Sequence, residues 1–177
     1  LNPVKFQRIT QHDRFRDVLA GISAAKEAGF SPIKLNVVAI KGINDDEIQQ
    51  LAGLSIHQPY AVRFIEFMPI GGKSCWDREK VITADEIKSR LGSLGTLQEV
   101  PPSVNDGPAR RYRFENAKGE IGIISPISNH FCAACNRLRL TADGKLRPCL
   151  FSDHEIDIKT PLRNGCTRDE IKRLIQQ

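Results

Sequence analysis

Three cysteines form the strongest chemical signal in this sequence of 177 residues. Cys132 and Cys135 stand in a C-A-A-C motif, and Cys149 follows after thirteen intervening residues. Two thiolates at this spacing can hold one metal from a single turn, and a short hairpin can return a third thiolate to the same metal. The triad therefore predicts a metal site.

The residues around the triad leave three interpretations open. Spacing alone favours zinc, because His130 or His154 could complete a Cys3His set. Three cysteines could instead hold a 4Fe-4S cluster, which usually has four protein ligands, so one iron would stay open to a substrate atom. The third interpretation is unliganded, buried cysteines. A two-cysteine redox motif fits less well, because C-A-A-C precedes a hairpin rather than opening a helix.

Basic residues gather around the triad. Residues 110–147 hold eight basic and three acidic residues, whereas the rest of the chain holds equal numbers of each. Arg137 and Arg139 follow Cys135 at alternating positions, which would place both side chains on one face of a strand. A guanidinium binds phosphate through two parallel hydrogen bonds and stays charged. The pattern favours an anionic ligand such as phosphate, with a solvated basic surface as the alternative.

The first hundred residues alternate between helical and strand patterns, which indicates an α/β fold with parallel strands and crossover helices. The expected elements are a helix that carries Phe15, Val18, Leu19 and Ile22 and ends at Gly29, a strand over Ile33–Ile40, a helix opened by a capping box of Asn44 and Glu47, a strand over Ala61–Met68, and a helix capped by Thr83 and Glu86.

Proline and glycine cluster at residues 101–108, where we place a boundary between regions 1–100 and 101–177. Beyond it the sequence predicts two hairpins. The second, with strands in RLRLT and LRPCLF, lies between Cys135 and Cys149 and turns at Asp143 and Gly144. Thr167 and Glu170 predict a capped terminal helix. The second region is therefore expected to be small and rich in hairpins.

Composition bounds the rest. With 40% hydrophobic and 27% charged residues, the chain is an ordinary globular protein and not a collagen, coiled coil or disordered chain. It is short for a complete eight-unit barrel of roughly 250 residues. No apolar run approaches the roughly 20 residues that cross a bilayer, so no membrane partner is expected. Five unevenly spread cysteines argue against a disulfide framework and for a reducing, cytoplasmic compartment.

Four segments together resemble one enzyme family: KLNVVAIKGIND, VRFIEFMPIG, GEIGIISPIS and FCAACNRLRLTADGKLRPCLF. The sequence is similar to the carboxy-terminal half of the MoaA-type GTP 3',8-cyclases, the radical S-adenosylmethionine (SAM) lyases of molybdenum-cofactor biosynthesis. The cysteine triad followed by N-R-L-R is the most specific element. The resemblance implies the later strands of an incomplete TIM-like barrel, followed by a small iron–sulfur region.

The resemblance also implies roles for individual residues. Cys132, Cys135 and Cys149 would bind a 4Fe-4S cluster whose open iron meets the guanine of GTP. Further GTP contacts would come from Lys34 and from the stretch Arg137, Leu138 and Arg139, while Met68 would line the SAM site. GTP and SAM are then the expected ligands; the resemblance also allows a homodimer and implies no nucleic-acid partner.

Considered without the resemblance, Lys34 and Met68 each have an ordinary structural role as the alternative. Lys34 opens an apolar strand, where a lysine often only reaches back to solvent. Met68 follows an apolar strand, where methionine is usually core, although ligands collect beyond the carboxyl ends of parallel strands. Glu66 shares the face of Met68 and either contacts the site or forms a structural pair. Cys75 and Cys166 lack partners at metal spacing and are expected to be structural.

One motif of the family is missing from the sequence. Radical SAM enzymes hold the SAM-cleaving cluster with an amino-terminal C-x-x-x-C-x-x-C, and the first cysteine here is Cys75. We therefore expect this chain to be a carboxy-terminal portion that binds substrate and is inactive alone. We assign no catalytic residue to it. The complete enzyme would convert GTP into (8S)-3',8-cyclo-7,8-dihydroguanosine 5'-triphosphate, using a second cluster in the missing half.

A different class of function fits the same cysteines. A Cys3His zinc ribbon with a basic hairpin could dock on nucleic acid, with Arg110, Arg111 and Arg113 on phosphates. Aromatic residues make up only 6% of the chain, and few flank these arginines, so base stacking is poorly served. The zinc ribbon therefore stays the alternative interpretation.

Overall fold

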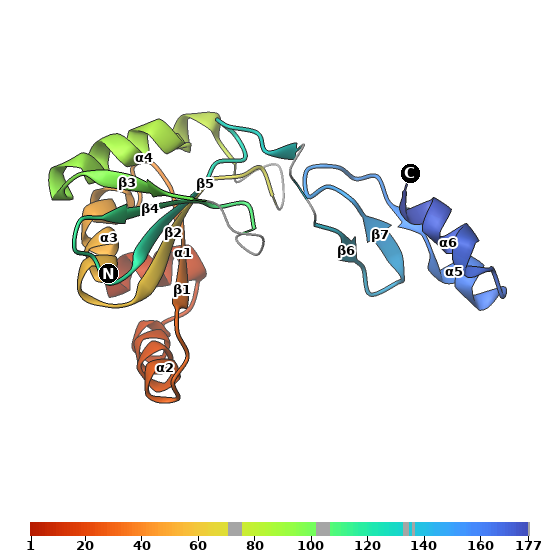
Figure 1. Ribbon diagram of the computed structural model, residues 1–177, viewed down its shortest axis with the longest axis horizontal. Coiled ribbons are helices and arrows are strands. Elements are labelled where there is room, and N and C mark those ends of the chain that lie inside the picture. The colour runs from red at the N-terminus through yellow and green to blue at the C-terminus, as the bar shows by residue number, and fades with distance from the viewer. Residues whose placement is uncertain (71–75, 102–106, 133–134, 136, 177) are drawn as a thin grey trace.

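The computed structural model describes residues 1–70, 76–101, 107–132, 135 and 137–176. Cys75 and the centre of the Pro/Gly-rich segment, residues 102–106, lie outside the described residues. Figure 1 shows a mixed α/β chain in two parts, a five-stranded sheet with its helices and a three-stranded sheet followed by two short helices. The expected α/β class is confirmed, and the described residues form these two sheets without a closed barrel.

The first part contains most of the regular structure. Its elements in chain order are α1 (Pro3–Thr10), α2 (Phe15–Glu27), β1 (Ile33–Ala39), η1 (Asp45–Glu47), α3 (Ile48–His57), β2 (Tyr60–Glu66), η2 (Arg78–Lys80), α4 (Ala84–Leu91), η3 (Gly92–Leu94), β3 (Leu97–Val100), β4 (Arg110–Phe114) and β5 (Glu120–Ile124). None of the described helices is both long and apolar enough to cross a bilayer.

The five-stranded sheet has the order β1-β2-β5-β4-β3. Strands β1 and β2 are parallel, as the alternating pattern predicts. Strand β5 also runs parallel to β2, which the sequence did not predict, whereas β4 runs antiparallel to β5 and β3 antiparallel to β4. The first expected hairpin, β4 with β5, is confirmed. The boundary that we place at residues 100–101 falls between β3 and β4, two paired strands of this one sheet.

The two faces of the sheet have different surroundings. One face carries the core: Phe64, Ile121 and Ile123 are buried there, and α3 packs against β2 and β5 while α4 packs against α3. On the opposite face, Lys34, Asn36 and Val38 of β1 are exposed. The period of two along each strand therefore leaves one sheet face open for side chains that do not serve the core.

Helix caps follow the sequence at two of the three expected positions. Thr83 and Glu86 form a complete capping box at α4, and Thr167 and Glu170 form another at α6 (Arg168–Ile175). The capping box of Asn44 is wrong. Its side chain instead accepts a hydrogen bond from the Ile40 amide at 2.8 Å and donates to the Val38 carbonyl at 2.9 Å, which closes the loop after β1. Helix α3 therefore starts after the single 3-10 turn η1.

The turn between β4 and β5 closes the carboxyl end of α3. Gly119 donates from its amide to the Ser55 carbonyl at 2.8 Å, and Lys118 donates to the Ile56 carbonyl at 3.2 Å. A Cβ atom added to Gly119 would lie 2.1 Å from the Tyr60 carbonyl oxygen. This approach is possible only for glycine, because the obstructing atom belongs to the backbone.

We expect Gly119→Ala to lower the free energy of unfolding by about 1–3 kcal/mol or more, because the backbone of β2 must move to admit the methyl group. Chemical denaturation followed by circular dichroism measures the change. Gly53→Ala is the matched control, since no atom lies within 4 Å of its added Cβ and the residue is inside α3. An equal loss in both variants would contradict the steric argument.

The second part contains the expected hairpin between Cys135 and Cys149. Its elements are β6 (Arg139–Leu140), β7 (Lys145–Arg147), β8 (Ile156–Asp157), α5 (Lys159–Arg163) and α6. β6 pairs antiparallel with β7, and the turn between them places Gly144 at φ 87°. Strand β6 begins only at Arg139, so Arg137 precedes it; the expectation that both arginines share one strand face is wrong.

Candidate functional site

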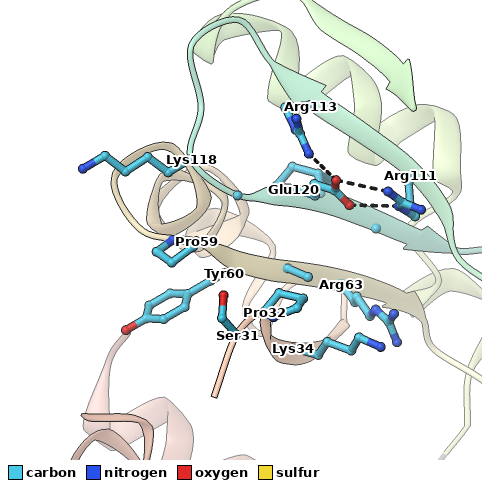
Figure 2. Close-up of a pocket in the computed structure, with 14 residues that line it drawn as sticks. Ser31, Pro32, Lys34, Pro59, Tyr60, Arg63, Arg111, Arg113, Lys118 and Glu120 are labelled. Atoms are coloured by element: carbon cyan, nitrogen blue, oxygen red, sulfur yellow. Dashed lines mark hydrogen bonds and ion pairs between the residues drawn. The ribbon is translucent and has the colours of Figure 1, made fainter. Parts of the chain in front are cut away.

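A hollow of about 400 Å³ opens at the amino ends of β1 and β2, beside the β4–β5 turn (Figure 2). Its wall is mostly polar and basic. The residues that line it are Ser31, Pro32, Lys34, Pro59, Tyr60, Ala61, Arg63, Arg111, Arg113, Lys118, Gly119, Glu120, Ile121 and Gly122. Five cationic side chains against one carboxylate make this a site for an anion.

Lys34 and Arg63 come from neighbouring parallel strands of the open sheet face. The strand register pairs Lys34 with Ala61 and Asn36 with Arg63, so the two cations are offset by one pleat, and Figure 2 shows them on the same side of the sheet. Within the described part of the chain, no carboxylate pairs with either. Their charge is therefore available to a ligand.

A glycine on β5 makes room for Arg63. A Cβ atom at Gly122 would lie 2.8 Å from Cγ of Arg63, so the arginine stem crosses the strand where a side chain is missing. Gly122 is also paired with Arg63 in the parallel β2–β5 register. The sequence therefore builds the cationic position from an arginine on one strand and a glycine on the next.

The other two arginines of the hollow are bound by one carboxylate. Arg111 donates to Glu120 from Nε at 2.8 Å and from a terminal nitrogen at 3.1 Å, and Arg113 makes a further short contact with the same carboxylate. The hydrogen bonds from Arg111, and secondly from Arg113, hold the pKa of the Glu120 carboxyl below its usual value. Glu120 thus remains ionised and offsets part of the positive charge.

Cys132 and Cys135 lie in the segment that leads to the second part. The Cys135 amide donates to the Cys132 carbonyl at 3.1 Å, and both residues are exposed free thiols. Hydrogen bonds from the backbone and then the side chain of Arg137 lower the pKa of the Cys135 thiol. The Arg137 guanidinium also lies 5.3 Å from the centre of the Phe131 ring. The lowered pKa favours the thiolate, which is the form that binds metals.

The structure does not gather the triad into one ligand set. Cys149 is an exposed free thiol just after β7, and among the described residues no three His, Cys, Asp or Glu side chains are arranged to hold a metal. Arg147, two residues before Cys149, has a buried Nε without a hydrogen-bond partner in the described chain. A buried donor of this kind normally has an acceptor.

The other expected ligand residues lie in separate places. Lys34 is in the basic hollow, whereas Arg139 is half-buried in β6, next to the exposed Leu138. Figure 1 shows β6 in the second part, away from β1. Met68 is half-buried, two residues beyond the end of β2, because that strand ends at Glu66 rather than at Met68 as predicted.

Arg63 is the site residue that sequence reasoning missed. It stands inside VRFIEFM between residues that are buried, and the alternation along β2 turns it to the open face with Ala61 and Ile65. The sequence did contain a signal for this residue. Arg63 interrupts an otherwise apolar strand at a position that the alternation places on the open face. Pairing it with Lys34 required the strand register, which the sequence does not state.

Comparison with known proteins adds a family. Residues 60–177 match the model described as Molybdenum Cofactor Synthesis C. The chain is 51% identical over 176 residues to the GTP 3',8-cyclase of Thermodesulfovibrio yellowstonii, covering 99% of this chain and 54% of that protein. It is 49% identical over 179 residues to the GTP 3',8-cyclase of Desulforamulus reducens, with the same coverage. The chain thus spans about half the length of these relatives.

Proposed function

The chain belongs to the Molybdenum Cofactor Synthesis C family, and we propose that it is the substrate-binding half of a GTP 3',8-cyclase. The observation that carries the proposal is the pair of cations, Lys34 and Arg63, which face one hollow without a carboxylate partner among the described residues. A polyphosphate supplies the missing negative charge. The relatives named above act on GTP according to their names, and a triphosphate suits this hollow.

We propose two separate groups of residues that contact GTP. Lys34 and Arg63 are proposed to hold phosphate oxygens, Lys as a point charge and Arg through two parallel hydrogen bonds. Arg137, Leu138 and Arg139 are proposed as the second group of GTP contacts, beside the cysteines. These groups lie in different parts of the chain. We propose that they meet on one GTP molecule only when the remaining half of the enzyme closes the site.

The cysteine donors fit a 4Fe-4S cluster. Thiolates are the soft ligands that iron–sulfur clusters require, and Cys135 has a lowered pKa before any metal binds. Arg147 is two residues before Cys149 in the sequence, and its buried Nε, which has no partner among the described residues, is a donor suited to a sulfide acceptor. Cys132, Cys135 and Cys149 would hold the cluster. When bound, it supplies an iron that stays open to an atom of the substrate.

The complete enzyme is proposed to be a radical SAM lyase. Its reaction converts GTP into (8S)-3',8-cyclo-7,8-dihydroguanosine 5'-triphosphate, the first step of molybdopterin cofactor biosynthesis. The open face of β1, β2 and β5 would form part of the interior of an incomplete TIM-like barrel. Met68, beyond the carboxyl end of β2, is proposed to line the SAM site. Free cysteines suit a reducing, cytoplasmic compartment.

Titration calorimetry with GTP tests the substrate site in a fusion of this chain to the part of the Thermodesulfovibrio yellowstonii relative that it does not cover. We expect Lys34→Ala, Arg63→Ala and Arg139→Ala each to weaken binding by roughly tenfold to 150-fold, because one charge-assisted contact contributes about 1.5–3 kcal/mol. Lys80→Ala is the control, since Lys80 lies outside the hollow and pairs only weakly with Asp77 at 3.9 Å. Unchanged affinity in all three site variants would reject the proposed GTP contacts.

A further inference from the structure

Glu66, the last residue of β2, is a fully buried carboxylate. Burying a charge is costly unless donors surround it. Its Oε2 accepts from the amides of Ile127 at 2.8 Å and Ser128 at 2.9 Å, and its Oε1 accepts from the amide of Ala84 at 2.9 Å and from the hydroxyl of Ser128. Four donors from two distant segments therefore meet on one side chain.

The first of these segments is the start of a helix. Ala84 is the first residue of α4, and its amide is one of the donors that a helix leaves without an internal partner. The carboxylate also lies at the positive end of the helix dipole. The capping box already satisfies two further amides of this end, those of Thr83 and Glu86. Glu66 therefore fixes α4 against the end of β2.

The second segment leads directly to the cysteines. Residues 126–129 form a turn after β5, closed by a hydrogen bond from the Asn129 amide to the Ser125 carbonyl at 3.1 Å. Only His130 and Phe131 separate this turn from Cys132. The chain leaves the five-stranded sheet here and passes to the second part (Figure 1). The orientation of this turn thus sets the direction in which the cysteine segment departs.

We propose that Glu66 is a positioning residue for the cluster-binding segment. It fastens the 126–129 turn to the carboxyl end of β2, and so fixes the point from which the segment with Cys132 and Cys135 leaves the sheet. The link to the cluster rests on the proposed function, whereas the fastening of the turn does not.

Two measurements on the 177-residue chain test the proposal. In Glu66→Gln, the amide group turns a donor toward backbone donors, so hydrogen exchange at the amides of Ile127 and Ser128 should be at least about tenfold faster. After anaerobic reconstitution, iron and sulfide per chain should fall by about half or more, together with the cluster absorption. Ser128→Ala should show both effects more weakly. Ser128→Thr keeps the hydroxyl, so its exchange rates and cluster content should be those of the wild type.

Thr83→Ala is the matched control, because it weakens the cap of α4 without touching the turn. It should keep the wild-type cluster content. Equal cluster loss in Thr83→Ala, or wild-type exchange in both Glu66→Gln and Ser128→Ala, would overturn the proposal. If Glu66→Gln fails to fold, the two Ser128 variants decide. If the wild-type chain takes up no iron, the proposed function fails, and the exchange rates still decide whether Glu66 holds the turn.

Discussion

Cys135→Ser is expected to remove the iron–sulfur cluster from the reconstituted chain and to leave iron and sulfide at background. A serine hydroxyl stays protonated at neutral pH and offers a hard oxygen, whereas a cluster needs a thiolate. Cys132→Ser and Cys149→Ser should have the same effect, because a cluster with three protein ligands has none to spare. Anaerobic reconstitution followed by absorption spectroscopy and by iron, sulfide and zinc analysis makes the measurement.

Cys166→Ser provides the control for this result. Cys166 is a half-buried free thiol outside the metal-spaced motif, so its replacement should leave cluster content unchanged. Zinc in place of iron would instead support the zinc-ribbon interpretation. Stoichiometric zinc with neither iron nor sulfide, lost in a His154→Ala variant, would identify a Cys3His site and would remove the reason for assigning an open iron to GTP.

The sequence predicted the parallel core because burial imposes a clear pattern there. β1 alternates between half-buried and exposed positions, and β2 alternates between buried and half-buried positions from Ala61 onward. The Thr83 and Thr167 caps depend only on contacts three residues apart. Asn44 was misread because its side chain had two local uses. The structure employs it to close the loop after β1 rather than to cap α3.

The site was predictable to the extent that its chemistry is local. The C-A-A-C motif and the adjacent arginines are neighbours in sequence, and in the structure Arg137 donates hydrogen bonds to the Cys135 thiol. The Lys34–Arg63 pair depends on strand register, and the carboxylate that neutralises Arg111 comes from the next strand of a hairpin. Glu66 joins residues 61 or more positions apart at the turn. Such long-range contacts carry no short-range signal.

The 177-residue chain alone is expected to release no 5'-deoxyadenosine under strong reductant, even with its cluster restored. Cleavage of SAM requires a cluster that can chelate the methionine end of the cofactor, and no C-x-x-x-C-x-x-C motif is present in this sequence. The hollow around Lys34 is also open to water, where charge interactions are weaker than in a closed site. Release measured by chromatography tests this expectation, and turnover would mean that the Cys132 triad itself generates the radical.

Fusion to the part of a relative that this chain does not cover should produce activity. We expect fusion to the part of the Thermodesulfovibrio yellowstonii GTP 3',8-cyclase that this chain does not cover to yield both 5'-deoxyadenosine and the cyclised nucleotide. Strand β1 is at the edge of the sheet, so its outer backbone groups offer a template for a further parallel strand, which would also wall the hollow. In the same fusion, Cys132→Ser should reduce the cyclised product far more than 5'-deoxyadenosine, because it removes the substrate cluster and leaves the SAM cluster intact. Equal loss of both products would mean that the two clusters do not have the separate roles proposed for them.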